Sequence, residues 1–215
     1  MKRFVFFLLV GGVTATLFAQ IDLPEHDFAV GSWSFIGDRV YQTDDREALA
    51  KTNLKIPQSG AMLYEFDVRY EGGAEDGHGG FGIHLFADRA TKEPSWGVGK
   101  SWLIWLNYDD DPVKGSKIPV GLSGQVYRST SNAAMELVHS VDLNDYQSFL
   151  TRDFLNDPIH IKIYANGDTG EVRIYDPTEE GKYYGFTIDK KYLPLKGDWM
   201  AVRTNCAKFS FAISE

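Results

Sequence analysis

The amino-acid sequence predicts an all-β protein, an antiparallel sandwich or barrel with one short helix at its rim. Short β-type runs recur along the chain, and glycine-, proline- and asparagine-containing turns separate them. Aromatic residues make up 14% of the chain and sit mostly inside these runs, where packing between sheets would bury them. One stretch, 143–157, has a helical rather than an alternating pattern.

The expected strands are short and follow one another along the whole chain after the N-terminal segment. They cover 32–35, 39–42, 48–54, 62–70, 80–86, 101–108, 121–129, 135–142, 159–164, 171–175, 183–188, 200–204 and 209–213. Residues 165–171 contain Asn-Gly and Thr-Gly between two alternating runs, which indicates a hairpin turn. The helix has Asn144 as a suitable N-cap, apolar residues at helical spacing after it, and Pro158 as its stop.

The first twenty residues have the layout of a secretory signal peptide. Two basic residues precede an apolar run at 4–10, and small residues follow it. This run is too short to cross a bilayer, which takes about 20 apolar residues, so cleavage near Gln20 is expected rather than anchoring. We therefore expect residues 1–20 to be removed and residues 21–215 to form a single domain, exported to the periplasm or the exterior.

The composition excludes several classes of function. The chain carries 22 basic and 30 acidic residues, a formal charge of −8, so nucleic acid and anionic membrane surfaces are not expected partners. Its single cysteine, Cys206, cannot form an internal disulfide, and stability must come from packing. The five histidines show no HxH or HExxH spacing, so zinc is not expected.

Residues 62–70 show a strict alternation of apolar and charged side chains. Glu65, Asp67 and Arg69 occupy alternate positions, and aromatic residues and Val68 occupy the others. Because side chains alternate between the faces of a strand, the aromatic row is expected in the core and the charged row outside. On a concave sheet the charged row would line a groove, whereas on an outer sheet it would be solvated and its charges would pair with each other.

Four segments carry a resemblance to a known superfamily. They are LYEFDVRY at 63–70, GGFGIHLF at 79–86, IHIKIYANGDTGEVRIYD at 159–176 and GDWMAVRTNCAKFSFAIS at 197–214. Together they resemble the concanavalin A-like lectin/glucanase superfamily, and within it the laminin-G-like jelly rolls and sugar-hydrolase-like domains. The resemblance spans about residues 28–213 and implies an antiparallel two-sheet β-sandwich of jelly-roll type that binds carbohydrate.

The glucanases of this superfamily carry their nucleophile and acid/base on one strand as Glu-x-Asp-x-Glu. Glu65 and Asp67 match the first two positions, but Arg69 stands where the acid/base should be. A retaining glycosidase needs two carboxyls about 5 Å apart, one of them protonated, and a guanidinium cannot act as that acid. We therefore assign no catalytic residue.

Tryptophans are the expected stacking groups for a sugar. Trp96 lies in a Gly-flanked loop, while Trp102 and Trp105 lie three apart in one strand and must face opposite sides. One of these two rings is therefore free to stack on a sugar, or to be buried against a partner or the expected helix at 143–157. His84 lies six residues after His78 across a turn, where the two could converge. The expected ligand-binding residues are Glu65, Asp67, Arg69, His84, Trp96, Trp102 and Trp105.

Calcium is the one cofactor that the sequence suggests. Asn107, Asp109 and Asp111 have alternating spacing at the end of a strand and could supply three of the six to eight oxygens that calcium takes. Lectin-like sandwiches often hold this ion at a rim. The alternative is that these acids form a solvated turn before Pro112.

Three functions agree with these observations. The leading hypothesis is an exported, non-catalytic carbohydrate-binding protein of the cell envelope or exterior, with a glycan or an envelope protein as its partner. The second is a structural or assembly protein of a periplasmic or surface appendage that uses the sandwich as an adhesive surface. The third is a glycoside hydrolase-like enzyme whose two carboxyls come from elsewhere on the concave face.

Overall fold

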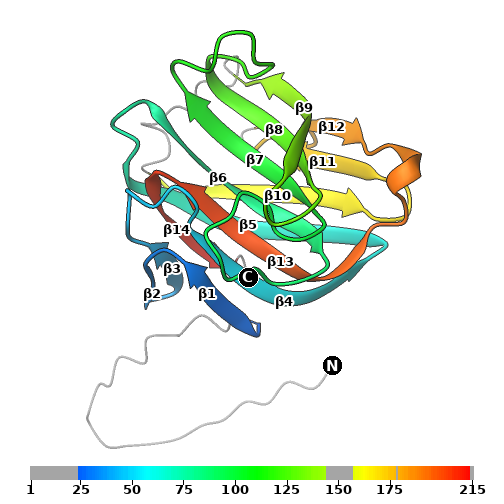
Figure 1. The fold of residues 1–215 in the computed structure, drawn as a ribbon, viewed down its shortest axis with the longest axis horizontal. Helices are drawn as coiled ribbons and strands as arrows, with labels where there is room; N and C mark the ends of the chain where they lie inside the picture. Colours follow the sequence, from blue (N-terminus) through cyan, green and yellow to red (C-terminus); the bar gives the residue numbers. More distant parts are fainter. Residues whose placement is uncertain (1–23, 144–156, 178, 214–215) are drawn as a thin grey trace, which may run out of the picture.

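The computed structural model of the protein describes residues 24–143, 157–177 and 179–213. Within these ranges, fourteen strands form two antiparallel seven-stranded sheets that pack as a β-sandwich (Figure 1). The strands of the front sheet, in spatial order, are β1 (His26–Val30), β4 (Lys51–Ser59), β13 (Lys196–Asn205), β6 (His78–Ala87), β7 (Ser101–Asp109), β8 (Gly121–Ser129) and β9 (Met135–Asp142). Those of the back sheet are β12 (Tyr183–Thr187), β11 (Glu171–Tyr175), β10 (Ile159–Asn166), β5 (Ala61–Gly73), β14 (Ala207–Ile213), β3 (Arg39–Gln42) and β2 (Trp33–Ile36). A 3₁₀ turn, η3 (Lys190–Tyr192), precedes β13.

The core lies between the two sheets and is rich in phenylalanine. Phe81 of β6 packs against Phe209 and Phe211 of β14, with ring centroids 5.1 and 6.2 Å apart. A buried amide also joins the sheets, because the Tyr64 hydroxyl of β5 donates to Oε1 of Gln58 in β4 at 2.7 Å. Apolar packing and this hydrogen bond together fix the front sheet against the back sheet.

Strand β7 is buried on both of its faces. Trp102 and Ile104 point into the core, while Leu103 and Trp105 point the other way, and all four side chains are buried. A strand with one solvated face alternates buried and exposed residues, so an unbroken apolar run indicates cover on both sides. The outer face of the front sheet is therefore covered near its centre.

The predicted two-sheet sandwich is confirmed, and each expected strand overlaps an observed one. The strand expected at 48–54 begins three residues later in the structure and spans Lys51–Ser59. The observed strand contains Pro57. This proline lies beyond the four-residue stretch of β4 that pairs with β1, so its missing N–H breaks no bond to that strand. Strand β1 was not predicted, because it is a short edge strand with a single buried residue, Val30.

Two sequence-based predictions fall outside the described residues. They are the rim helix at 143–157, of which only the two end residues are described, and the signal peptide at 1–20. Both stay predictions. In the part of the chain that is described, no helix has the length and apolar character needed to span a membrane.

Candidate functional site

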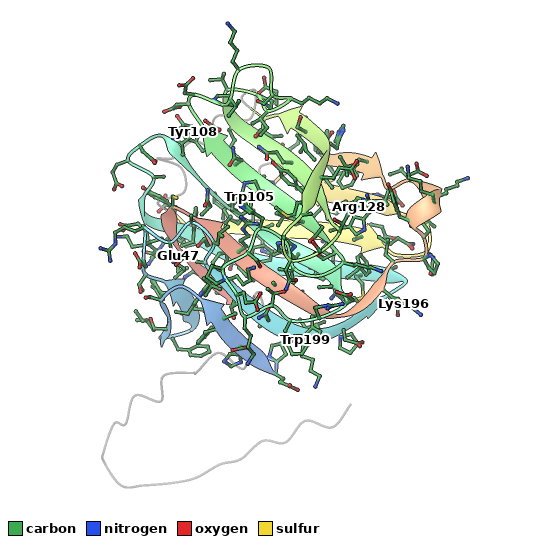
Figure 2. The ribbon with its side chains drawn as sticks, in the orientation of Figure 1. Glu47, Trp105, Tyr108, Arg128, Lys196 and Trp199 are labelled. Carbon is green, nitrogen blue, oxygen red and sulfur yellow. The ribbon has the colours of Figure 1, made fainter. Side chains whose placement is uncertain are left out.

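A groove of about 500 Å³ crosses the outer face of the front sheet. Its floor is formed by Leu103, Trp105 and Asn107 of β7, Gln125 and Tyr127 of β8, and Arg203 of β13. The loop between β6 and β7 places Trp96 at the rim, where 56% of this residue is exposed. Trp105 lies near the centre of the molecule in Figure 2. The groove thus combines one exposed indole with a largely buried floor.

Trp105 can lie flat on the sheet because its neighbours on β6 are glycines. A Cβ atom at Gly82 would lie 2.9 Å from Cε3 of the indole, and one at Gly80 would lie 2.9 Å from Cζ2. The indole N–H donates to Oδ1 of Asn107 at 3.0 Å, which fixes the ring and orients the amide. Glycines in β6 therefore create the space that the tryptophan fills.

Arg203 is the central charged residue of the floor, and only 2% of it is exposed. Its guanidinium lies 5.3 Å from the ring centre of Trp96 and 5.4 Å from that of Trp105. Nη1 donates to the carbonyl of Trp96 at 2.5 Å, while Nε has no partner among the described residues. Burial lowers the pKa of Arg203 to about 10, so the group is still charged at neutral pH.

Lys51 of β4 is a second buried cation. It lies beneath the loop between β6 and β7, residues 88–100, which we call the Trp96 loop. Its ammonium donates to the carbonyl of Ser95 at 2.9 Å and contacts that residue's hydroxyl at 3.1 Å and the Gly97 carbonyl at 3.5 Å. Burial, and then the positive charge of Arg203, lower the pKa of Lys51 to about 8. Both cations therefore hold the Trp96 loop by its carbonyl groups.

His84 of β6 lies under the groove and is fully buried. Its Nδ1 is 2.9 Å from the hydroxyl of Ser101, and its Nε2 has no partner among the described residues. Burial, with the positive charges of Arg203 and Lys51, holds the pKa of His84 well below its usual range. The ring is therefore neutral and supports the floor.

Polar side chains on β8 form a row along the groove. The Tyr127 hydroxyl donates to Oε1 of Gln125 at 2.6 Å, and Nε2 of Gln125 donates to the Ser123 hydroxyl at 2.8 Å. These two bonds fix the orientation of the Gln125 amide. Burial raises the pKa of Tyr127, so its hydroxyl keeps its proton at neutral pH.

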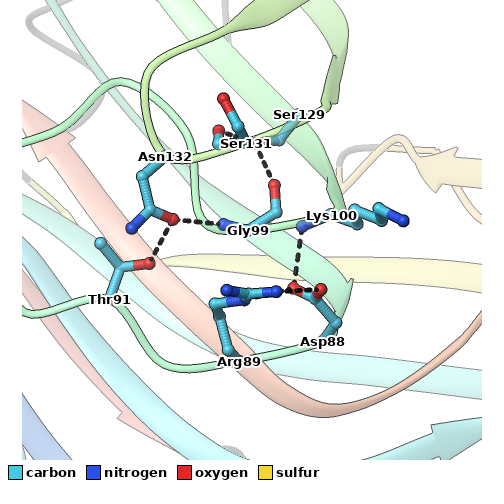
Figure 3. A network of polar contacts seen from close by, with 8 residues as sticks. All are labelled: Asp88, Arg89, Thr91, Gly99, Lys100, Ser129, Ser131 and Asn132. Carbon is cyan, nitrogen blue, oxygen red and sulfur yellow. Dashed lines mark hydrogen bonds and ion pairs between the residues drawn. The ribbon is translucent and has the colours of Figure 1, made fainter.

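Hydrogen bonds to the end of β8, to the loop that follows it and to Asp88 hold the end of the Trp96 loop (Figure 3). Oδ1 of Asn132 accepts from the Gly99 N–H at 2.9 Å and from the Thr91 hydroxyl at 3.1 Å. The Ser129 hydroxyl contacts the Gly99 carbonyl at 2.8 Å, and the Lys100 N–H donates to Oδ1 of Asp88 at 2.8 Å. Such a loop can present Trp96 in a fixed position.

The structure brings only some of the predicted ligand-binding residues together. Trp96 and Trp105 line the groove, and His84 lies beneath it. Trp102 belongs to the core between the sheets, as its spacing from Trp105 required, so it cannot contact a ligand in the groove.

The charged row of β5 lies away from the groove, on the outer face of the back sheet. The structure thus separates Glu65, Asp67 and Arg69 from the tryptophans with which they were expected to bind a ligand, because β5 and β7 belong to different sheets. Glu65 pairs with Lys162 at 3.1 Å, Asp67 with His160 at 3.0 Å, and Arg69 with Glu71 at 2.8 Å. The row is therefore a ladder of surface ion pairs.

The three residues considered for calcium already have other contacts. Oδ1 of Asn107 accepts from Trp105, and Oδ1 of Asp109 accepts from the Asp111 N–H at 3.0 Å and lies 3.2 Å from Nε2 of His78. Among the described residues, no group of three or more histidines, cysteines and acids could hold a metal ion. Calcium at Asn107, Asp109 and Asp111 stays a prediction.

Four residues of the site were not singled out from the sequence: Lys51, Gln125, Tyr127 and Arg203. The run WMAVRT at 199–204 contains a signal that could have identified Arg203. Met200 and Val202 face the core, so Arg203, at the next alternate position, faces outward. The uninterrupted apolar run of β7 is a second signal that this outer face is covered. Neither pattern reveals that the two cations lie together.

No protein-family model matches the chain. Over 172 residues, 79% of its length, the chain is 26% identical to starch synthase 3, chloroplastic/amyloplastic, of Arabidopsis thaliana. The match covers 16% of that protein, so the chain corresponds to a small part of this longer relative.

Several solved structures are similar in fold. The metal-free carbohydrate recognition domain of Emp46p has a TM-score of 0.52 at 14% identity, with 87% of this chain and 84% of that chain covered. Peanut lectin has a TM-score of 0.52 at 11% identity, with 89% and 93% covered. A legume lectin-like domain from Entamoeba histolytica has a TM-score of 0.50 at 13% identity, with 87% and 86% covered. These likenesses show that the chain has the concanavalin A-like sandwich fold.

Proposed function

We propose that the protein binds carbohydrate in the groove of the front sheet without transforming it. The observation that carries this proposal is an exposed indole, Trp96, above a floor of oriented amide and hydroxyl groups from Asn107, Gln125 and Tyr127. An aromatic ring stacks on the apolar face of a sugar, and fixed polar groups bind its hydroxyls. The lectin sandwiches of the same fold and the match to starch synthase 3 support this class of ligand.

The presence of a single carboxylate among the described lining residues favours binding of a glycan over its hydrolysis. Of the residues that line it in the described part of the chain, Asp109 is the one carboxylate, and it lies beside His78. Glycoside hydrolysis needs two carboxyls on either side of the scissile bond. The β5 acids cannot provide the second, because they lie on the opposite sheet.

Titration calorimetry with a panel of neutral and acidic polysaccharides, α-glucans included, tests the proposal. Trp96→Ala should lower the affinity for the bound glycan by about tenfold or more, because the ring that stacks on the sugar is lost. Tyr183→Ala is the matched control, since Tyr183 is 47% exposed but belongs to the back sheet. It should leave binding unchanged.

Two results would contradict carbohydrate binding in this groove. The first is that no glycan of the panel binds, and the second is that Trp96→Ala binds as tightly as the unmodified protein. Release of reducing sugar from the bound glycan would instead contradict the absence of catalysis. Repeating the titration with EDTA and with added calcium tests the predicted role of Asn107, Asp109 and Asp111.

We also propose that the protein is exported, on the strength of the N-terminal sequence. Mass spectrometry of the mature protein from its native cells should give an N-terminus near Gln20. An intact N-terminal methionine in the mature protein would contradict export through this leader.

A further inference from the structure

Two buried positive charges, Arg203 in the floor of the groove and Lys51 beneath it, have no ion pair with a described carboxylate. The Arg203 guanidinium donates a hydrogen bond to the Trp96 carbonyl and lies against two indole rings. Lys51 contacts two carbonyl oxygens and a hydroxyl of the same loop. Carbonyl dipoles and aromatic rings solvate a cation, but they do not cancel its charge.

Neighbouring groups are consistent with a positive field in the floor. Burial is the main cause that lowers the pKa of His84 and of Lys51, and the charge of Arg203 lowers both pKa values further. The carboxylate that lines the groove, Asp109, lies 3.2 Å from His78, whose own pKa is raised. The positive field is local, because the chain as a whole carries a formal charge of −8.

The simplest explanation is that the two cations only anchor the Trp96 loop. That role explains neither why charged donors are used nor why a donor of Arg203 has no acceptor among the described residues. Neutral donors such as asparagine or serine can hold carbonyl groups without the cost of burying two like charges, and the Ser129 hydroxyl does so for the Gly99 carbonyl of this loop. Moreover, Arg203 lines the groove, and its Nε is buried without a hydrogen-bond acceptor. A buried cation with unused donors at the surface of a groove can bind an anionic group of a ligand.

We propose that the groove selects acidic glycans, in which a carboxylate or a sulfate group of the sugar lies at Arg203 while the ring stacks on Trp96. This inference rests on the proposed carbohydrate binding and names the class of glycan. The carboxylate or sulfate would accept hydrogen bonds from the guanidinium and compensate the charge of Lys51 behind it. The exposed indole is then the stacking platform, and the cations are the source of selectivity.

The experiment compares each acidic glycan with its own neutral form. One pair is oligogalacturonate and the same oligosaccharide with its carboxyls reduced to alcohols, and the other is a sulfated galactan and its desulfated form. At least one acidic form should bind about tenfold more tightly or better, and that preference should shrink between 50 and 500 mM salt, on the scale expected for screened charges. The pair that shows the preference identifies the acidic group.

Three variants test whether the preference for the acidic glycan comes from the cations. Arg203→Met should abolish the preference for the acidic form, and Lys51→Met, which removes a charge beneath the floor, should reduce it. Circular dichroism and urea unfolding show whether each variant is folded, so Lys51→Met keeps the inference testable if Arg203→Met disturbs the loop. Arg203→Lys should keep part of the preference, since it keeps the charge without the planar fork.

The possible failures are distinguishable. Equal affinity for both members of each pair, or tighter binding of the neutral form, overturns the acidic selectivity and leaves carbohydrate binding intact. An acidic preference that both methionine variants retain in full also overturns it, because the preference would then come from other residues. If neither member of either pair binds, and no polysaccharide of the panel binds, both the proposed function and this inference are overturned.

Discussion

Substitution of Gly82 by alanine tests how the front sheet makes room for Trp105. Away from any contact, this change at a strand glycine would stabilise the protein by about 0.4–1 kcal/mol, because alanine restricts the unfolded chain. At Gly82 the added Cβ would lie 2.2 Å from the carbonyl oxygen of Ile104 and 2.9 Å from the indole of Trp105. The structure therefore predicts the opposite sign.

The magnitude follows from how little the neighbours can move. Ile104 and Trp105 lie in β7, which pairs with β6 on one side and β8 on the other, so a shift of the carbonyl breaks ladder geometry on both sides. Overpacking of this kind costs about 1–3 kcal/mol and occasionally more. Because the 2.2 Å contact is with the backbone, we take the upper end of this range, about 3 kcal/mol; subtraction of the unfolded-state gain then predicts that Gly82→Ala lowers the free energy of unfolding by about 2 kcal/mol.

Urea unfolding followed by tryptophan fluorescence and circular dichroism measures this change, provided that the slope of the transition is unaltered. Gly124→Ala is the control, because Gly124 is also a mid-strand glycine of the front sheet. Its Cβ would meet methyl groups of Val141 at 3.1 Å and Leu143 at 3.3 Å, and side-chain ends can move aside. A change within about 1 kcal/mol is expected there. The reasoning is refuted if Gly82→Ala is as stable as the unmodified protein, or if Gly124→Ala loses as much.

Three further predictions concern stability. The pKa of Lys51 is about 8 in the folded protein and 10.5 in an unfolded chain, so between pH 8 and 10.5 the unfolded chain binds more protons than the folded protein. The free energy of unfolding should therefore rise over this pH range by up to about 3 kcal/mol. In a pH series of urea unfolding, Lys51→Met should lack this part of the rise. Gln58→Leu should lower the free energy of unfolding by about 2–4 kcal/mol, since the buried Tyr64 hydroxyl and Phe86 N–H each lose their acceptor. A decrease of less than about 1 kcal/mol in thermal and urea unfolding would contradict this. Glu65→Gln on the back sheet should change stability by less than about 0.5 kcal/mol and leave glycan binding unchanged in calorimetry, because its ion pair is exposed.

The sequence by itself determined the elements and the direction of their side chains. Period-two alternation placed Val68 and the aromatic residues of β5 in the core and its charged row outside, and the structure confirms both. The spacing of Trp102 and Trp105 likewise required opposite faces, which the structure shows. Side-chain direction along a strand is a local property of the backbone, so it can be read from neighbouring residues.

Tertiary structure decided which outer face carries the groove. An outward side chain of β5 and one of β7 look alike in sequence, yet Glu65 faces solvent on the back sheet and Trp105 faces a covered groove on the front sheet. The same holds for Lys51 and Arg203, which are 152 positions apart and meet because β4 and β13 pair as neighbours and one loop covers both. Strand order and loop cover depend on pairings between distant segments, and no local pattern of alternation encodes them.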